Sequence, residues 1–158
     1  MAMKSVAAAG FGLLITTVVC SASAGPIEEL AGYWTGTGSV TLASGKAERV
    51  KCAVTYKVEN GSGQIKQTMR CASADYSINA TTELRVKGSQ VSGSWEEKTY
   101  SAVGQVTGRY TGNAFVLSIQ GASFTATLNV TLANCKQTIN ITPQGLEVNR
   151  ISIGLSKC

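Results

Sequence analysis

Residues 123–132 read SFTATLNVTL. Apolar side chains stand at every second position from Phe124 to Leu132, and serine, threonine or asparagine stands between them. This period of two is typical of a β-strand that turns one face to an apolar core and the other face to water. The stretch therefore predicts an all-β protein whose outer surface carries hydroxyl and amide groups.

The same alternation continues in both directions along the chain. Only residues 27–31 could form a short helix, and no helix long enough to connect parallel strands is apparent. We expect an antiparallel meander of about 8–10 strands that closes into a barrel, because closure removes the unpaired edges. A two-sheet sandwich is the alternative architecture. The segments that carry the pattern are 30–42, 49–58, 65–71, 76–84, 91–95, 106–110, 115–119, 124–132, 139–141 and 151–155.

Four cysteines follow the first 24 residues, and their even number predicts a disulfide framework. The turn around Asn60-Gly61 centres a hairpin in which Cys52 lies opposite Cys71 and Val54 opposite Met69. Three pairings are possible for four cysteines. The hairpin favours Cys52–Cys71 and leaves Cys135–Cys158, a bridge that strand register alone does not predict.

Residues 1–24 have the pattern of a secretory signal peptide. Lys4 supplies a positive charge, residues 6–20 are largely apolar, and Ala22-Ser23-Ala24 is a small-residue cleavage site. We expect an exported protein, periplasmic or extracellular, whose mature chain 25–158 is a single β-barrel domain. Lipidation of Cys20 is the less favoured alternative, because Val19 stands where a lipoprotein signal needs a small residue.

Strand parity assigns the charged side chains to the outside of the barrel. An outer-membrane barrel would need apolar side chains there, so we expect a barrel that does not span a membrane and has no nucleic-acid partner. Glu97 is the one charged residue that we single out as pointing inward. The arginines expected to face outward are Arg49, Arg70, Arg85, Arg109 and Arg150.

The composition excludes several chemistries. The chain contains no histidine and a single aspartate, Asp75, which removes imidazole catalysis and leaves little material for a carboxylate metal site. Glu96 and Glu97 are adjacent, so the pleat sends them to opposite faces. We therefore expect no metal, no cofactor and no catalytic residues, and we interpret the protein as a non-enzyme.

Residues 30–34 read LAGYW, and this opening resembles the Gly-x-Trp signature of lipocalins and related calycin barrels. The resemblance implies that Trp34 plugs the closed end of the barrel in a structural role, and that an arginine from a late strand packs over it. No arginine of the late strands has the parity for that role. Gly93-Ser94-Trp95 repeats the tripeptide.

The same opening, followed by cysteines, also resembles that of small secreted bacterial metalloprotease inhibitors. Those proteins are disulfide-bonded barrels that insert an N-terminal trunk into the protease cleft. The resemblance implies that residues 25–30 form such a trunk. This chain is longer and carries two additional cysteines.

The interior is either a filled core or a cavity for a ligand. Ten strands make a wide barrel, and Gly36, Gly38, Gly93, Gly104 and Gly108 add no inward bulk; strand bending is the other reason for glycines at such positions. Our first hypothesis is a binding protein for a small hydrophobic ligand held inside the barrel. The alternative is a protein-binding module, an inhibitor or an envelope scaffold, that acts through its loops and N-terminal segment. Size and parity predict a ligand site made of Tyr56, Met69, Tyr76, Trp95, Phe115 and Phe124.

Overall fold

A computed structural model describes residues 27–158, so the predicted signal peptide and Cys20 lie outside the described residues. A short 3-10 helix, η1, precedes ten strands joined by short loops. The elements are η1 (Glu28–Leu30), β1 (Gly32–Leu42), β2 (Ala47–Glu59), β3 (Gln64–Ala72), β4 (Ser77–Lys87), β5 (Gln90–Glu97), β6 (Ala102–Tyr110), β7 (Ala114–Gln120), β8 (Thr125–Ala133), β9 (Lys136–Gln144) and β10 (Val148–Ser156).

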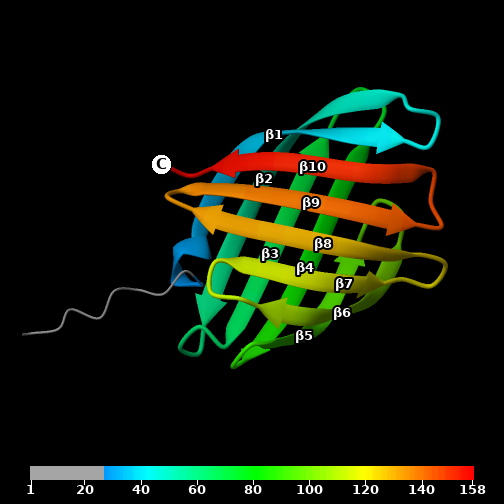
Figure 1. Cartoon of the computed structure of the whole chain (residues 1–158). Coiled ribbons are helices and arrows are strands. Elements are labelled where there is room, and N and C mark those ends of the chain that lie inside the picture. The colour runs from blue at the N-terminus through cyan, green and yellow to red at the C-terminus, as the bar shows by residue number, and fades with distance from the viewer. Residues whose placement is uncertain (1–26) are drawn as a thin grey trace, which may run out of the picture.

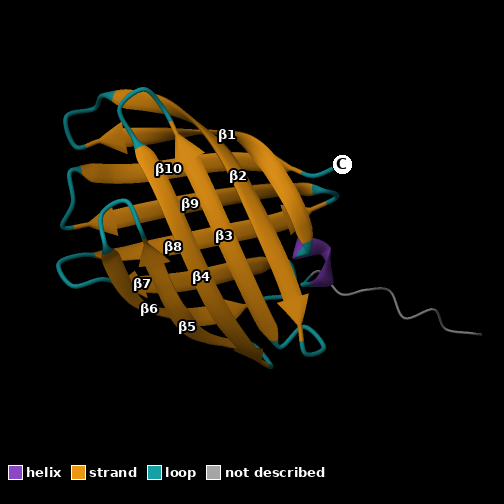
Figure 2. Cartoon of the chain, turned by 180° about the vertical axis from the view of Figure 1, so that it is seen from behind, coloured by secondary structure: helices purple, strands orange, loops and turns teal. Residues whose placement is uncertain are grey.

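The ten strands form one closed antiparallel barrel. Each strand pairs with its neighbours in sequence, and β1 pairs with β10 to close the ring. In Figure 1 the later strands cross in front of β3 and β4, and Figure 2 shows the opposite wall from behind. The predicted all-β barrel is confirmed, and the sandwich alternative is excluded because no strand edge is left open.

The predicted hairpin register is also confirmed. Cys52 lies opposite Cys71, and Val54 lies opposite Met69. Both expected disulfides form, Cys52–Cys71 within this hairpin and Cys135–Cys158 between the β8–β9 turn and the C-terminal end.

The two ends of the barrel differ. We call the end with η1 and Lys157 the floor, and the opposite end the mouth; both are seen at the left and right of Figure 1. The mouth is formed by the loops 43–46, 73–76, 98–101, 121–124 and 145–147. Trp34, Val54 and Ile153 are among the most deeply buried side chains between the two ends.

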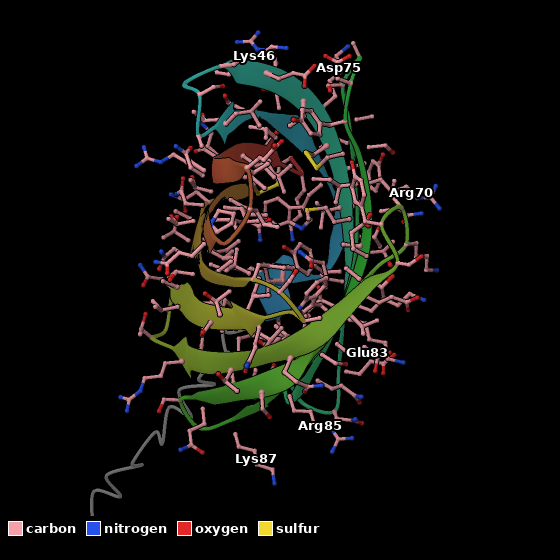
Figure 3. All side chains as sticks on the ribbon, turned by 90° about the vertical axis from the view of Figure 1, so that its right-hand side faces the viewer. Lys46, Arg70, Asp75, Glu83, Arg85 and Lys87 are labelled. Atoms are coloured by element: carbon pink, nitrogen blue, oxygen red, sulfur yellow. A yellow bond between two sulfur atoms is a disulfide. The ribbon has the colours of Figure 1, made fainter. Side chains whose placement is uncertain are left out.

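The outer surface is polar, as parity predicts. Figure 3 looks toward the mouth and shows Arg70, Glu83, Arg85 and Lys87 pointing away from the barrel wall. All five arginines expected to face outward are exposed. Within residues 27–158, no helix has the length and apolar character needed to cross a bilayer, and no three metal-ligating side chains gather.

The inner glycines do not widen the lumen. A Cβ atom at Gly93 would lie 2.0 Å from the backbone oxygen of Glu83, and one at Gly104 would lie 1.9 Å from that of Gln120. These distances are far inside van der Waals contact, so the neighbouring strand already occupies the place of a side chain. Strand bending, rather than room for a ligand, is the reason for glycine at these positions.

Candidate ligand-binding site

Trp34 closes the floor of the barrel. The side chain is fully buried, and its indole N–H donates to the carbonyl of Leu30 at 2.7 Å, which fixes the chain at the end of η1. Ile27 and Leu30 are buried in the same cluster. The described part of the segment expected to form a protease-binding trunk therefore packs into the barrel floor.

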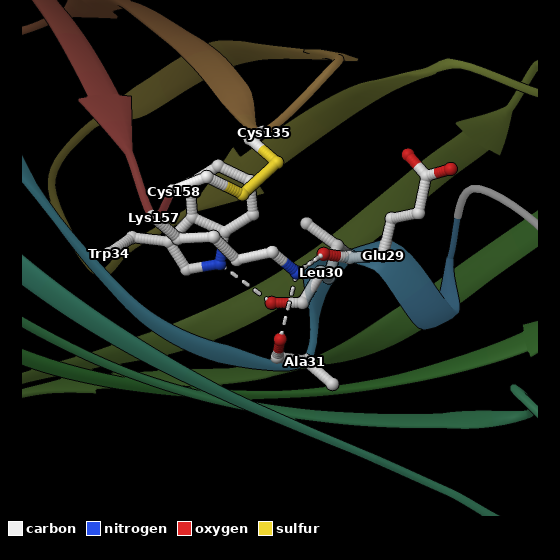
Figure 4. Close-up of a disulfide and its surroundings, with 7 residues drawn as sticks. All are labelled: Glu29, Leu30, Ala31, Trp34, Cys135, Lys157 and Cys158. Atoms are coloured by element: carbon white, nitrogen blue, oxygen red, sulfur yellow. Dashed lines mark hydrogen bonds between the residues drawn. A yellow bond between two sulfur atoms is a disulfide. The ribbon is translucent and has the colours of Figure 1, made fainter.

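Lys157 takes the place that the lipocalin resemblance gives to an arginine. Its ammonium group lies 5.0 Å from the centre of the Trp34 ring, within the range of a cation–π contact. It also donates to the carbonyls of Glu29 and, at 3.1 Å, of Ala31 (Figure 4). The neighbouring Cys135–Cys158 disulfide holds this C-terminal segment against the barrel. The sequence analysis missed Lys157, because it considered only arginines on late strands.

A chain of three polar side chains crosses the barrel above the floor. Gln67 donates to the hydroxyl of Tyr56 at 3.0 Å, and that hydroxyl donates to Gln137 at 3.1 Å. Gln137 is only 2% exposed, and its amide nitrogen has no partner. Burial raises the pKa of Tyr56 to about 12, although its hydrogen bonds to Gln67 and Gln137 act in the opposite direction. Tyr56 therefore remains a neutral phenol at physiological pH.

A small inner cavity of about 60 Å³ lies above this polar chain. This volume holds a few water molecules and is well below the roughly 300–1,000 Å³ typical of ligand pockets. Side chains thus fill most of the floor half of the barrel. The polar groups that line the cavity are Tyr56, Gln67 and Thr82, and the remaining lining is apolar.

The mouth half of the barrel contains a larger pocket. Its volume is about 540 Å³, within the range of small-molecule sites. Most of its wall is aromatic or aliphatic, and Tyr100 and Leu146 stand at its rim with 63% and 45% of their surfaces exposed. Its lining residues are Val40, Tyr76, Ile78, Trp95, Glu97, Tyr100, Ala102, Ser123, Phe124, Pro143, Leu146, Glu147, Val148 and Ile151.

Trp95 separates the two spaces. Its side chain lines both the inner cavity and the mouth pocket, and its ring lies 5.6 Å from the ring of Phe124 with a tilt of 54°. This spacing and tilt are typical of a favourable aromatic pair. The indole nitrogen of Trp95 is buried without a partner, close against Gly104.

Glu97 points inward, as predicted, and holds the β5–β6 loop. Its carboxylate accepts the N–H groups of Asn79 and Tyr100, both at 2.7 Å. Burial acts to raise the pKa of Glu97, but these two bonds and those from Thr99 outweigh it and hold the pKa below its ordinary value. Glu97 is therefore ionised at neutral pH and places a negative charge in the wall of the mouth pocket.

Five of the six residues predicted to bind a ligand line one or both of these spaces. Tyr56 and Phe115 line the inner cavity, Tyr76 and Phe124 line the mouth pocket, and Trp95 lines both. Met69 packs against the core and lines neither space.

Several residues of these two spaces were not predicted as site residues. Gln67 was expected on the inward face of its strand but was not assigned to the site, and Thr82 has the inward parity of Tyr76, Ile78 and Leu84, so alternation alone could have revealed both. Tyr100 and Glu147 lie in loops, where alternation carries no signal. Glu48 also turns inward, opposite Val40, although we singled out only Glu97; it was missed because the strand was expected to begin at Arg49.

No family model matches the chain, and no curated protein matches its sequence. Among solved structures, the barrel is similar to the M. tuberculosis protein Rv2717c, with 12% identity and a TM-score of 0.67 over 85% of this chain and 98% of that one. It is similar to the S-type phycobiliprotein lyase CPES from Guillardia theta, with 12% identity and a TM-score of 0.60 over 84% and 90% of the two chains. It is also similar to a protein of unknown function from the DUF3598 family of Nostoc punctiforme, with 15% identity and a TM-score of 0.60 over 84% of this chain and 48% of that one.

One of these neighbours corrects an expectation. The sequence analysis interpreted the chain as a non-enzyme, yet a barrel of the same fold belongs to a protein described as a lyase. That expectation, which was drawn from the composition, was therefore wrong. At 12–15% identity the comparisons establish the fold alone, a closed barrel of ten antiparallel strands.

Proposed function

We propose that the protein binds a small, largely apolar molecule in the mouth pocket. The observation that carries this proposal is the pocket itself, about 540 Å³ in volume and lined mainly by aromatic and aliphatic side chains at the open end of a closed barrel. Such a concave apolar site with a few polar groups is the usual form of a small-molecule site.

The compartment is part of the same proposal. The chain begins with the pattern of a signal peptide, and its two disulfides are compatible with an oxidising compartment. We infer that the ligand is met outside the cytoplasm.

Binding can be measured with 1-decanol, a neutral probe, by isothermal titration calorimetry. Ala102 lines the pocket, whereas its neighbour Val103 faces outward with 64% of its surface exposed. The variant Ala102→Trp fills the pocket, and we expect it to weaken decanol binding at least tenfold. The matched control Val103→Trp adds the same ring outside the barrel and should leave the affinity unchanged.

A second variant distinguishes loss of the binding site from loss of folding. Leu146→Ala removes apolar surface from an exposed loop at the rim without altering a strand, and we expect a several-fold loss of affinity. Native mass spectrometry of protein purified from its own host should also detect a co-purified small molecule. Decanol affinity that is absent, or that is the same in the wild type, Ala102→Trp and Leu146→Ala, would contradict the proposal.

A further inference from the structure

The mouth pocket carries charge of one sign. Two carboxylates, Glu97 and Glu147, belong to its lining, and among residues 27–158 no lysine or arginine does. This is unexpected for a chain with a formal net charge of +5. The described basic residues lie outside the pocket lining, so the charge of the pocket is opposite in sign to the net charge of the chain.

A third carboxylate faces the same interior. Glu48 lies directly opposite Val40, and cross-strand partners in an antiparallel pair point to the same side of the sheet. Val40 is buried and lines the mouth pocket, so Glu48 also points into the barrel. One oxygen of Glu48 is buried and has no hydrogen-bond partner. An oxygen of this kind is expected to have a partner in the occupied protein.

Four aromatic side chains belong to the lining of the same pocket. Tyr76, Trp95, Tyr100 and Phe124 all line the pocket. The face of an aromatic ring carries negative charge density, and a cation within about 6 Å of the ring centre is attracted to it. Aromatic rings combined with carboxylates form the typical surroundings of a bound ammonium group.

Basic side chains near the mouth lie outside the pocket lining that contains the carboxylates. Lys46 in the β1–β2 turn and Lys98 in the β5–β6 loop are both exposed, and neither belongs to the pocket lining. Figure 3 shows Lys46 at the outer edge of the barrel. Their charges are screened by solvent, whereas Glu97 and one oxygen of Glu48 are buried.

We propose that the ligand of the mouth pocket is a hydrophobic cation: an amine or quaternary ammonium group attached to an apolar body. This inference rests on the proposed function and specifies its ligand class. The apolar body contacts the aliphatic and aromatic wall, and the ammonium group lies among the aromatic rings and the carboxylates of Glu97 and Glu147, with Glu48 on the same inner face of the barrel.

Three probes with the same ten-carbon chain separate charge from hydrophobicity. We would titrate the full disulfide-bonded protein with decyltrimethylammonium, 1-decanol and decanoate in low salt. The cation is expected to bind at least tenfold more tightly than the alcohol, and decanoate most weakly. Raising the salt concentration from about 0.05 to 0.5 M should weaken binding of the cation several-fold and leave the alcohol unchanged, because salt screens only the charged interaction.

Two variants test whether the preference for the cation over the alcohol comes from the carboxylates at the mouth. Glu147→Gln removes an exposed charge from a loop, and Glu48→Gln replaces the unpartnered oxygen. We expect each to weaken binding of the cation three- to tenfold and to affect decanol binding much less. Glu96→Gln is the matched control, because Glu96 is exposed on the outer face directly beside Glu97. It should bind all three probes as the wild type does.

The outcomes distinguish this inference from the proposed function. Equal affinity for the cation and the alcohol, or tightest binding of decanoate, overturns the cation inference while the pocket stands as an apolar site. A cation preference that survives both Glu147→Gln and Glu48→Gln also overturns it. Failure of all three probes to bind overturns the proposed function itself.

Discussion

The buried chain Gln67–Tyr56–Gln137 gives the most direct test of what holds the floor half together. Replacing Tyr56 by phenylalanine keeps the ring and removes only the hydroxyl. Gln137 then loses the single partner of its side chain at a site where it is 2% exposed. An unsatisfied buried polar group costs about 1–3 kcal/mol, so we expect Tyr56→Phe to lower the free energy of unfolding by about 2 kcal/mol.

Replacing the other partner of this hydrogen bond, Gln137, should have a smaller effect on stability. Gln137→Leu takes away the acceptor of the Tyr56 hydroxyl, but it also removes a buried amide nitrogen that has no partner, and the two effects offset each other. The Tyr56 hydroxyl still accepts the hydrogen bond from Gln67. We expect this variant to lie within about 1 kcal/mol of the wild type. The double variant should be less destabilised than the sum of the two single variants, because the group left unpaired by one change is removed by the other. Tyr33→Phe, at a position that is 62% exposed, is the control.

The assay is urea unfolding of the oxidised protein, followed by tryptophan fluorescence at pH 7 and again between pH 10 and 12. Tyr56 has a pKa of about 12 in the folded barrel, against an ordinary value of 10.0. The unfolded chain therefore loses the proton first, and wild-type stability should fall as the pH rises from 10 through 12. The loss specific to Tyr56 amounts to about 3 kcal/mol over this window and should be absent in Tyr56→Phe. Equal stability of the two proteins at pH 7, together with equal pH slopes, would refute the reasoning.

Three further changes test other parts of the barrel. Replacing Cys135 and Cys158 together by serine should lower the free energy of unfolding by about 3 kcal/mol in the chain-entropy model, given a sequence separation of 23; urea unfolding against the unreduced wild type measures the loss. Glu97→Gln should lower the free energy of unfolding by about 2 kcal/mol at pH 7 by weakening two charged hydrogen bonds. The folded barrel holds the pKa of Glu97 below its ordinary value of 4.5, so the unfolded chain gains the proton first as the pH falls through 4.5, and the difference between the two proteins should shrink from there downward. A difference in thermal melts that does not depend on pH would contradict this reasoning. Gly104→Ala should destabilise the barrel by about 3 kcal/mol or prevent its folding, because the added Cβ would lie 1.9 Å from a backbone oxygen. Gly154→Ala is the control: its Cβ would meet no atom within 4 Å, so this variant should have a melting temperature close to that of the wild type.

Local patterns were sufficient to predict most of the fold. Alternation identified the strands, because a half-buried strand requires one apolar face, and the Asn60-Gly61 turn set the register of its hairpin. That register in turn predicted the Cys52–Cys71 bridge. These features depend on residues close together in sequence, so a single chain contains the information for them.

The candidate site depends on contacts that such patterns do not encode. Lys157 reaches Trp34 only because the C-terminal segment meets η1 across the closure of the barrel. Six of the 14 residues that line the mouth pocket lie in loops, Tyr100 and Glu147 among them, and their direction follows from loop conformation rather than from parity. From the sequence, Gly104 could be recognised only as a glycine at an inward-facing position. Its close contact with the backbone of β7 is a tertiary contact that the sequence pattern does not show.

The pairing of β1 with β10 has a consequence for how the molecule folds. It joins residues such as Val40 and Ile151, with nearly the whole described chain between them. Every other strand pair is a sequence neighbour and can form as soon as its hairpin exists. Pairing over the longest separation is entropically the slowest, so the docking of β10 is expected to limit the rate of folding. Until that step is complete, the free edge of β1 can pair with another copy of the chain, and self-association competes with closure.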